Sequence, residues 1–260
     1  MSKSILGRKI GMSQVFIDDD VVGVTLVKTS PCTVLETGED HKGQFVMVGC
    51  EDTKENRINK PQAKMFEKLG ISYKKIIKKL PREQEREYKC KDSLEVDIFR
   101  IGEYVNVSGL SKGKGFQGGM KRWNWSGQPK THGSKMHRRP GSIGASATPS
   151  RVFKGKHMPG QMGDKQITVQ NLEIIDIDKE NGLLTLKGAV PGARNTLYVI
   201  AEAQKKKGRL SPRGKKIEEE LQKRQAEEEA KRQEEEAKRQ EEEVKTEEEK
   251  KREEDVQQKE

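Results

Sequence analysis

The chain has 260 residues, of which 52 are Lys or Arg and 42 are Asp or Glu, so its formal net charge at pH 7 is +10. Hydrophobic residues make up 31% of the chain, which even with glycine added lies below the roughly 45–50% of an ordinary globular protein, so part of the chain is expected to lack a core. No apolar stretch approaches the roughly 20 residues of a membrane helix, and the N-terminus lacks the apolar run of a signal peptide, so we expect neither membrane insertion nor secretion.

The three cysteines stand far apart, at Cys32, Cys50 and Cys90, and form no CxxC pair. An odd number at wide spacing is typical of a reducing compartment and argues against disulfides and against zinc. We therefore expect a cytoplasmic protein without disulfides.

Short β-rich runs separated by turn-forming residues predict a mainly β body. They occupy residues 13–17, 21–29, 44–50, 72–80, 104–107, 167–177, 183–187 and 196–201. Pro at a first helical turn and the stop signal Gly70 predict one short helix over residues 61–69. The runs up to residue 107 are too few to close a barrel, and so are the runs from residue 167 onward. We therefore predict one small β-barrel body made of residues 1–107 and 166–204.

Residues 108–165, which interrupt this body, differ sharply in composition. They carry 12 Lys or Arg against the single acid Asp164, and they hold 12 of the 25 glycines, four of the nine prolines and both tryptophans. Such a segment lacks the apolar area that would offset its own ordering entropy. We predict a long basic, glycine-rich loop extension that is ordered by its partner.

The composition of the extension is typical of a backbone that lies against RNA. Glycine lets main-chain N–H groups approach phosphates, which Lys and Arg neutralise. Trp123 and Trp125, together with Phe116 and Phe153, offer planar faces for unpaired bases, although the two tryptophans are equally compatible with a small local core. Acidic proteins or membrane lipids would also attract cations, but the glycines and the lack of an amphipathic apolar face fit RNA better. The predicted RNA-binding residues are Lys112, Lys114, Gly115, Lys121, Arg122, Trp123, Trp125, His132, His137, Arg138, Arg139, Arg151, Lys154 and Lys156.

An RNA-modifying or nucleotide-using enzyme is the first alternative, because residues 113–118 match the GxGxxG string of dinucleotide-binding loops. Between Tyr104 and Gly163, however, no Asp or Glu is present to hold a ribose, bind magnesium or act as a base. Three histidines in the extension have no cysteine or carboxylate beside them, so we expect no metal site. We therefore predict no catalytic residue, no cofactor and no small-molecule substrate.

The tail, residues 205–260, is of low complexity. Residues 205–216 hold seven basic and no acidic residues, whereas residues 217–260 hold 11 basic and 19 acidic ones in a seven-residue repeat. Five Glu-to-cation pairs spaced by four residues favour a single charged helix, and one apolar position per heptad is too few for a coiled coil. We predict a solvent-exposed helical or disordered tail, with partner binding as the less favoured alternative.

Eight motifs follow one another along the chain up to residue 192. They are GRKIGM (7–12), SKGKGFQG (111–118), KRWN (121–124), THG (131–133), HR (137–138), PGSIG (140–144), RVFKGK (151–156) and KGAVPG (187–192). In this order they resemble the universal large-subunit ribosomal protein three family in its bacterial form. The resemblance covers roughly residues 1–204 and does not include the tail.

The resemblance implies a structural constituent of the large subunit of the cytoplasmic ribosome, with a β-barrel body on the subunit surface and a loop threaded through 23S-class ribosomal RNA. It implies an early role in subunit assembly, and ribosomal proteins fourteen and nineteen as neighbours. The residues matching the loop tip near the peptidyl transferase centre are Gly144, Ala145, Ser146, Ala147 and Thr148. Some members carry a methylated Gln at the position of Ala147, so that modification is not expected here. A free RNA chaperone or assembly factor with the same chemistry is the second alternative.

Overall fold

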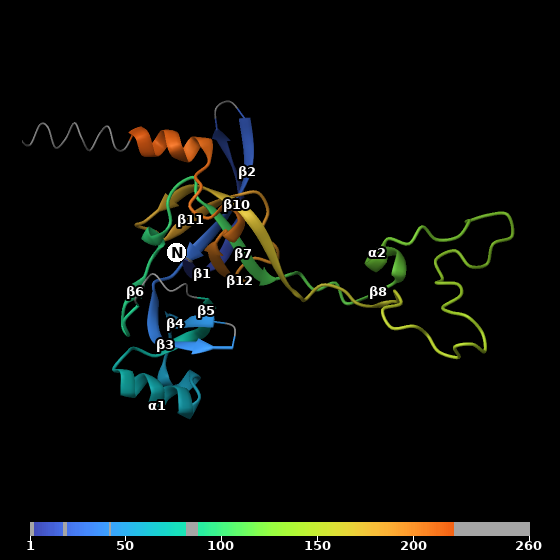
Figure 1. Cartoon of the computed structure of the whole chain (residues 1–260), viewed down its shortest axis with the longest axis horizontal. Coiled ribbons are helices and arrows are strands. Elements are labelled where there is room, and N and C mark those ends of the chain that lie inside the picture. The colour runs from blue at the N-terminus through green and yellow to red at the C-terminus, as the bar shows by residue number, and fades with distance from the viewer. Residues whose placement is uncertain (1–2, 18–19, 42, 82–87, 221–260) are drawn as a thin grey trace, which may run out of the picture. The chain divides into compact units, whose positions relative to one another are not determined.

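The computed structural model describes residues 3–17, 20–41, 43–81 and 88–220 (Figure 1). Strands dominate these residues, and the prediction of a mainly β fold is confirmed. The strands are β1 (Ser4–Ile17), β2 (Asp20–Thr29), β3 (Cys32–Asp40), β4 (Gly43–Asp52), β5 (Lys74–Pro81), β6 (Ser93–Leu94), β7 (Tyr104–Leu110), β8 (Phe116–Gln117), β9 (Gly160–Gln161), β10 (Gln166–Asp178), β11 (Leu183–Lys187) and β12 (Leu197–Glu202). Up to Arg209 the helices are α1 (Lys60–Leu69) and α2 (Gly119–Trp123), with 3-10 turns at Glu55–Arg57, Val96–Ile98 and Gln204–Lys206.

Six strands form a closed barrel in the order β1-β12-β7-β10-β11-β2, and β2 pairs back with β1. All the pairings around this ring are antiparallel. Buried and half-buried residues alternate along β7 and β12, as expected when one face of a sheet lines a core and the other does not. In β12, for example, Tyr198 and Ile200 are fully buried.

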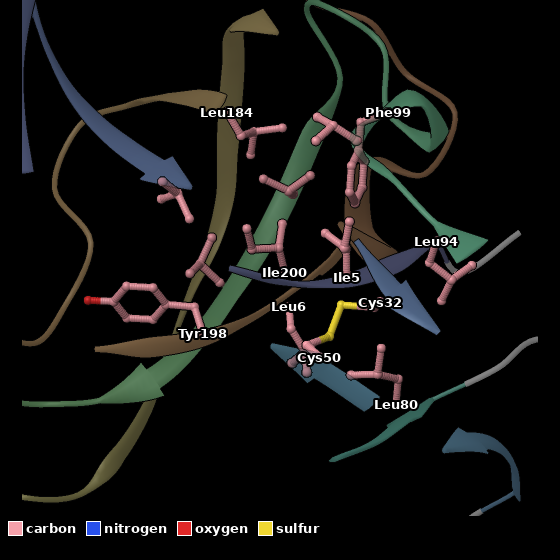
Figure 2. Packing of buried hydrophobic residues seen from close by; sticks show 14 of the residues in the cluster. Ile5, Leu6, Cys32, Cys50, Leu80, Leu94, Phe99, Leu184, Tyr198 and Ile200 are labelled. Carbon is pink, nitrogen blue, oxygen red and sulfur yellow. A yellow bond between two sulfur atoms is a disulfide. The ribbon is translucent and has the colours of Figure 1, made fainter. Parts of the chain in front are cut away.

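A second sheet, in the order β5-β4-β3-β6, lies outside the barrel ring. The sequence pattern missed β3, because four of the last five residues of this strand, Glu36, Gly38, Glu39 and Asp40, are of types that disfavour strands. The chain predicted as one barrel body therefore contains two sheets. They share a single hydrophobic cluster, in which Ile5 and Leu6 of the barrel are close to Leu80 of β5 (Figure 2).

Helix α1 follows the predicted start and stop signals closely. Proline occupies its first turn, and the chain leaves the helix at Gly70 in the left-handed conformation, with φ at 61°. Glycine adopts this conformation without a Cβ penalty, which explains the stop. The buried face of α1 consists of Ala63 and Phe66, and the Phe66 ring meets Tyr73 edge to face at 6.1 Å.

The cysteine prediction was wrong, because Cys32 and Cys50 form a disulfide inside the shared core (Figure 2). The two residues are direct partners in the β3–β4 register, and their Cα atoms are 4.6 Å apart. Their separation of 18 residues along the chain gave no indication of this, since cross-strand pairing depends on the hairpin register. Cys90 is a free, exposed thiol.

The chain divides into two compact units after Arg209. In the second unit residues 212–220 are helical, and the Ser211 hydroxyl accepts a hydrogen bond of 3.1 Å from the Gly214 N–H. A serine cap followed by Pro212 is a typical helix start. The rest of the predicted helical or disordered tail, residues 221–260, lies outside the described residues.

Gly109 provides a test of the barrel packing, because it pairs with Tyr198 across β7 and β12. A Cβ added at Gly109 would lie 2.2 Å from the Tyr198 ring. We expect Gly109→Ala to lower the free energy of unfolding in urea by about 1–3 kcal/mol, the usual cost of overpacking. Gly11→Ala is the matched control, since a Cβ there meets nothing within 4 Å. Equal stability of the two variants would contradict the packing described here.

The ion pair of Arg8 and Glu51 joins β1 of the barrel to β4 of the second sheet. Arg8 donates two hydrogen bonds to the carboxylate, one of them Nη2 to Oε2 at 3.1 Å, and a third to the Asn195 carbonyl at 2.7 Å. The bonds from Arg8 lower the pKa of Glu51 from its ordinary value of 4.5, outweighing the opposite effect of burial.

A carboxylate whose pKa is lowered on folding stabilises the fold above its unfolded pKa, and this contribution is lost as the pH falls through the folded value. We expect the stability of the chain to decrease below pH 4.5, the ordinary value for Glu51, and Glu51→Gln to make that decrease shallower. Urea unfolding at a series of pH values would measure both. If Glu51→Gln loses stability below pH 4.5 as steeply as the unmodified chain, the ion pair does not contribute to this pH dependence.

Candidate nucleic-acid interface

The extension leaves the barrel as a two-stranded stalk that continues the β7–β10 ladder (Figure 1). The Ser111 N–H donates to the Lys165 carbonyl at 2.9 Å, and the Lys114 N–H donates to the Met162 carbonyl at 2.9 Å. The short pair β8–β9 follows. Because the stalk is held by main-chain bonds, its side chains remain available for other contacts.

Gly163 is required where the two strands of the stalk approach most closely. Its φ is +74°, and a Cβ there would lie 2.1 Å from the Lys112 carbonyl oxygen. Any other residue would both strain the backbone and displace the neighbouring strand.

Helix α2 and the returning chain are joined at Met158. Arg122 Nη1 and Trp123 Nε1 both donate to the Met158 carbonyl, at 2.6 and 2.9 Å. The Trp123 ring stacks on His157 with centroids 4.0 Å apart and planes 4° apart, and the Arg122 guanidinium carbon lies 5.1 Å from the ring centroid of Trp123. We call these four residues, 122, 123, 157 and 158, the Met158 junction.

The two tryptophans differ in their surroundings. Trp123 takes part in the Met158 junction and is 38% exposed, whereas the half-buried Trp125 ring covers Gly119, where a Cβ would lie 2.0 Å from the ring. The freely exposed rings of the extension are instead Phe116, 76% exposed, and Phe153, 61% exposed.

Nearly all predicted RNA-binding residues lie on the surface. Arg122 and Trp125 are half-buried, and the others are exposed. Among the described residues, each ion pair between side chains involves residues of the body, so no carboxylate neutralises the cations of the extension. The list of predicted RNA-binding residues omits Lys130, Lys135 and Lys165, which are also exposed cations of the extension. The basic composition of the segment applies to them equally.

Positive charge also reaches the base of the stalk. Lys9 is only 8% exposed, and its Nζ donates to the Val190 carbonyl at 2.8 Å. Burial and the charge of Lys112 both lower the pKa of Lys9. The barrel therefore contributes a structural cation close to the first lysine of the extension.

Beyond α2 the chain makes a wide loop with few internal hydrogen bonds. The Gln128 N–H donates to the His137 carbonyl at 2.8 Å. An open pocket of about 510 Å³ lies beside this bond, with Gln128 in its lining. The pocket is lined in part by Trp125, Arg138 and Lys156. Such a lining suits a nucleotide, because the cations can contact its phosphate and the aromatic ring can stack on its base.

The predicted loop tip, residues 144–148, is exposed throughout. It is shaped by short local bonds, since the Ser142 hydroxyl donates to the Gly144 carbonyl at 3.0 Å and the Ser150 hydroxyl donates to the Ala147 carbonyl. Small side chains at these positions allow the tip to enter narrow spaces.

The described residues contain no cluster of His, Cys, Asp or Glu suited to a metal ion. His157 is engaged with Trp123, while His132 and His137 are exposed. Over the part of the chain that the structure covers, no helix is long and apolar enough to cross a membrane.

A mainly β body that carries a glycine-rich arm with 12 Lys or Arg and a single carboxylate is typical of the class of nucleic-acid-binding structural proteins. The family model described as "Ribosomal protein L3" matches residues 46–185. The chain belongs to this ribosomal protein family.

Curated relatives match nearly over their full lengths. The large ribosomal subunit protein uL3 of Thermotoga petrophila is 46% identical over 202 residues, which are 78% of this chain and 98% of that protein. The protein of the same name from Natranaerobius thermophilus is 46% identical over 210 residues, or 80% and 100% of the two chains. The one from Thermosipho africanus is 43% identical over 205 residues, or 78% and 99%.

Family membership bears on three sequence-based predictions. The predicted resemblance is confirmed, and so is the prediction that the chain is a structural protein and not an enzyme. The predicted localisation on the cytoplasmic ribosome is likewise confirmed by the family. The individual RNA-binding residues remain predictions.

Arg138 and Arg139 are exposed, whereas Arg122 also braces the Met158 junction. We expect the double variant Arg138→Ala/Arg139→Ala to weaken binding to large-subunit RNA and to reduce the slope of log K against log salt by about 1 per arginine. The thermal midpoint of unfolding should stay the same, because neither residue contributes to the core.

Lys75→Ala, which removes an exposed cation of the body, is the control for the loss of charge alone. Filter binding at four salt concentrations and a thermal melt would measure both effects. A double variant that melts earlier but binds RNA normally would reverse the roles assigned to these arginines.

Proposed function

We propose that this chain is a structural constituent of the large ribosomal subunit that binds 23S-class ribosomal RNA and supports early subunit assembly. The body, residues 1–107 and 166–204, docks on the subunit, and the extension, residues 108–165, lies among RNA segments. Neighbouring large-subunit proteins, fourteen and nineteen by resemblance, complete its surroundings.

One observation carries this proposal: the cations that surround the main-chain stalk and loop take part in no ion pair within the described part of the chain, and Asp164 is the single carboxylate of the extension. In a free protein such a distribution of charge is self-repelling, and phosphates relieve it by replacing the missing counter-charges. The relatives support the same partner, since they are named as large ribosomal subunit proteins.

Salt dependence tests the RNA contact directly. If about six phosphates are engaged, log K for large-subunit RNA should fall with log salt at a slope of roughly −4 to −5. Titrations of the full chain against 23S-class RNA between low and physiological salt would measure this slope. A flat response would refute the electrostatic contact.

The alternative of a transient assembly factor makes a different prediction about stoichiometry. A structural constituent is present at about one copy per mature large subunit, which quantitative mass spectrometry of purified subunits can determine. Clearly substoichiometric amounts would favour the transient factor.

We infer that the loop tip, residues 144–148, extends toward the peptidyl transferase centre. An iron chelate attached at Ser146→Cys, in a Cys90→Ser background, would cleave RNA around the tip. Cleavage is expected at nucleotides of that centre, and the same chelate at Lys75→Cys on β5 should cleave elsewhere. Identical cleavage patterns would contradict this inference.

A further inference from the structure

The hairpin of β1 and β2 continues beyond the strands that hold it in the barrel (Figure 1). β1 pairs with β12 only over Ser4–Arg8, but with β2 as far as Ile17 and Asp20. β2 in turn pairs with β11 only from Val24 onward. Within the described part of the chain, residues 10–17 and 20–23, here called the hairpin arm, therefore have no further strand on either edge.

One face of the hairpin arm is apolar and open to solvent. Met12, Phe16 and Val21 are 56%, 70% and 58% exposed. Phe16 and Val21 are direct cross-strand partners, and Met12 lies on the same face because side chains alternate along a strand. Between Met12 and Phe16 the exposed polar Gln14 lies opposite Gly23, where an added Cβ would meet nothing within 4 Å, so the apolar side chains of this face remain uncovered.

The charge of this segment is opposite to that of the extension. Residues 10–27 contain no Lys or Arg but three Asp, in a chain whose net charge is +10. Asp20, which begins β2, is exposed. Carboxylates without cations repel phosphates, so RNA is not a suitable occupant of the hairpin arm.

A protein is a suitable occupant, because open strand edges and exposed apolar side chains are normally covered in the functional state. Protein interfaces combine an apolar centre with charged residues of complementary sign at the rim. Asp20 precedes Val21 and therefore faces the opposite side of the hairpin, at the end of the described part of β2. A partner that covers the apolar side chains and reaches around this end must bring apolar side chains flanked by Lys or Arg.

We propose that the hairpin arm is the docking site for a cationic protein, which packs apolar side chains on Met12, Phe16 and Val21 and places basic residues beside Asp20. The proposal rests on the proposed function in one respect, that the partner is a neighbour on the same ribosomal subunit. It assigns separate surfaces to the two kinds of partner: the extension to RNA and the hairpin arm to protein.

Photocrosslinking within assembled subunits tests this assignment. Full-length chain with p-benzoylphenylalanine in place of Phe16 is reconstituted into large subunits and irradiated, and the adducts are identified by mass spectrometry. The matched control carries the same probe in place of Phe153, which has a similar exposure of 61% but lies in the extension. We expect a protein adduct at position 16, on a peptide with Lys or Arg next to apolar residues, and an RNA adduct at position 153.

Reversing the charge at Asp20 gives a directional readout. With the probe at position 16, Asp20→Lys should lower the yield of the protein adduct by about threefold or more, because it places like charges in contact. If RNA occupied the arm, the same change would instead raise an RNA adduct.

The outcomes separate the two proposals. An RNA adduct at position 16, no adduct there, or a protein adduct that Asp20→Lys does not weaken would overturn the docking site alone, provided that position 153 reports RNA. Failure of the chain to enter subunits would overturn the proposed function together with the docking site. If the probe at position 153 gives no RNA adduct, the assignment of the extension to RNA is overturned. The docking site is then decided by the adduct at position 16 alone.

Discussion

The ladder between β7 and β10 is the constraint on which the rest of the structure depends. In the barrel these two strands contribute buried side chains such as Val107 and Ile174 to the core. Their register then continues outward through the main-chain bonds of the stalk. Main-chain hydrogen bonds do not depend on side-chain identity, so the sequence of the stalk is free to be rich in glycine and lysine. The core thus positions an arm that has no apolar interior of its own.

Several strands and the end of helix α1 could be predicted from the sequence, because short β-rich runs and helix boundary residues are local signals. β11 has its expected range, β12 is shifted by one residue, and β7 begins as expected at Tyr104 but runs to Leu110, beyond the predicted end at Val107. The helix α1 is followed by Gly70, as its residues indicated. Two features depended on contacts between distant strands. The disulfide joins Cys32 and Cys50, whose proximity is determined by the register of β3 and β4, and the ion pair of Arg8 and Glu51 depends on how the barrel packs against the second sheet. No local pattern carries this information, because register depends on the whole sheet.

For the candidate site, charge composition was sufficient to locate the extension but not to assign individual roles. Among the cations, Arg122 differs from its neighbours because it donates to the Met158 carbonyl. Trp123 and Trp125 pack locally, whereas Phe116 and Phe153 remain open. For Arg122 and Trp123 the distinction arises from contacts with a chain segment more than 30 residues away, which a single sequence does not reveal.

The sparse bonding of the wide loop beyond α2 also bears on the fate of surplus protein. Exposed main chain without ladder partners is the preferred substrate of proteases, whereas paired strands resist cleavage. A copy that has not met its RNA would therefore be nicked in the loop, and a copy held among nucleotides would be shielded.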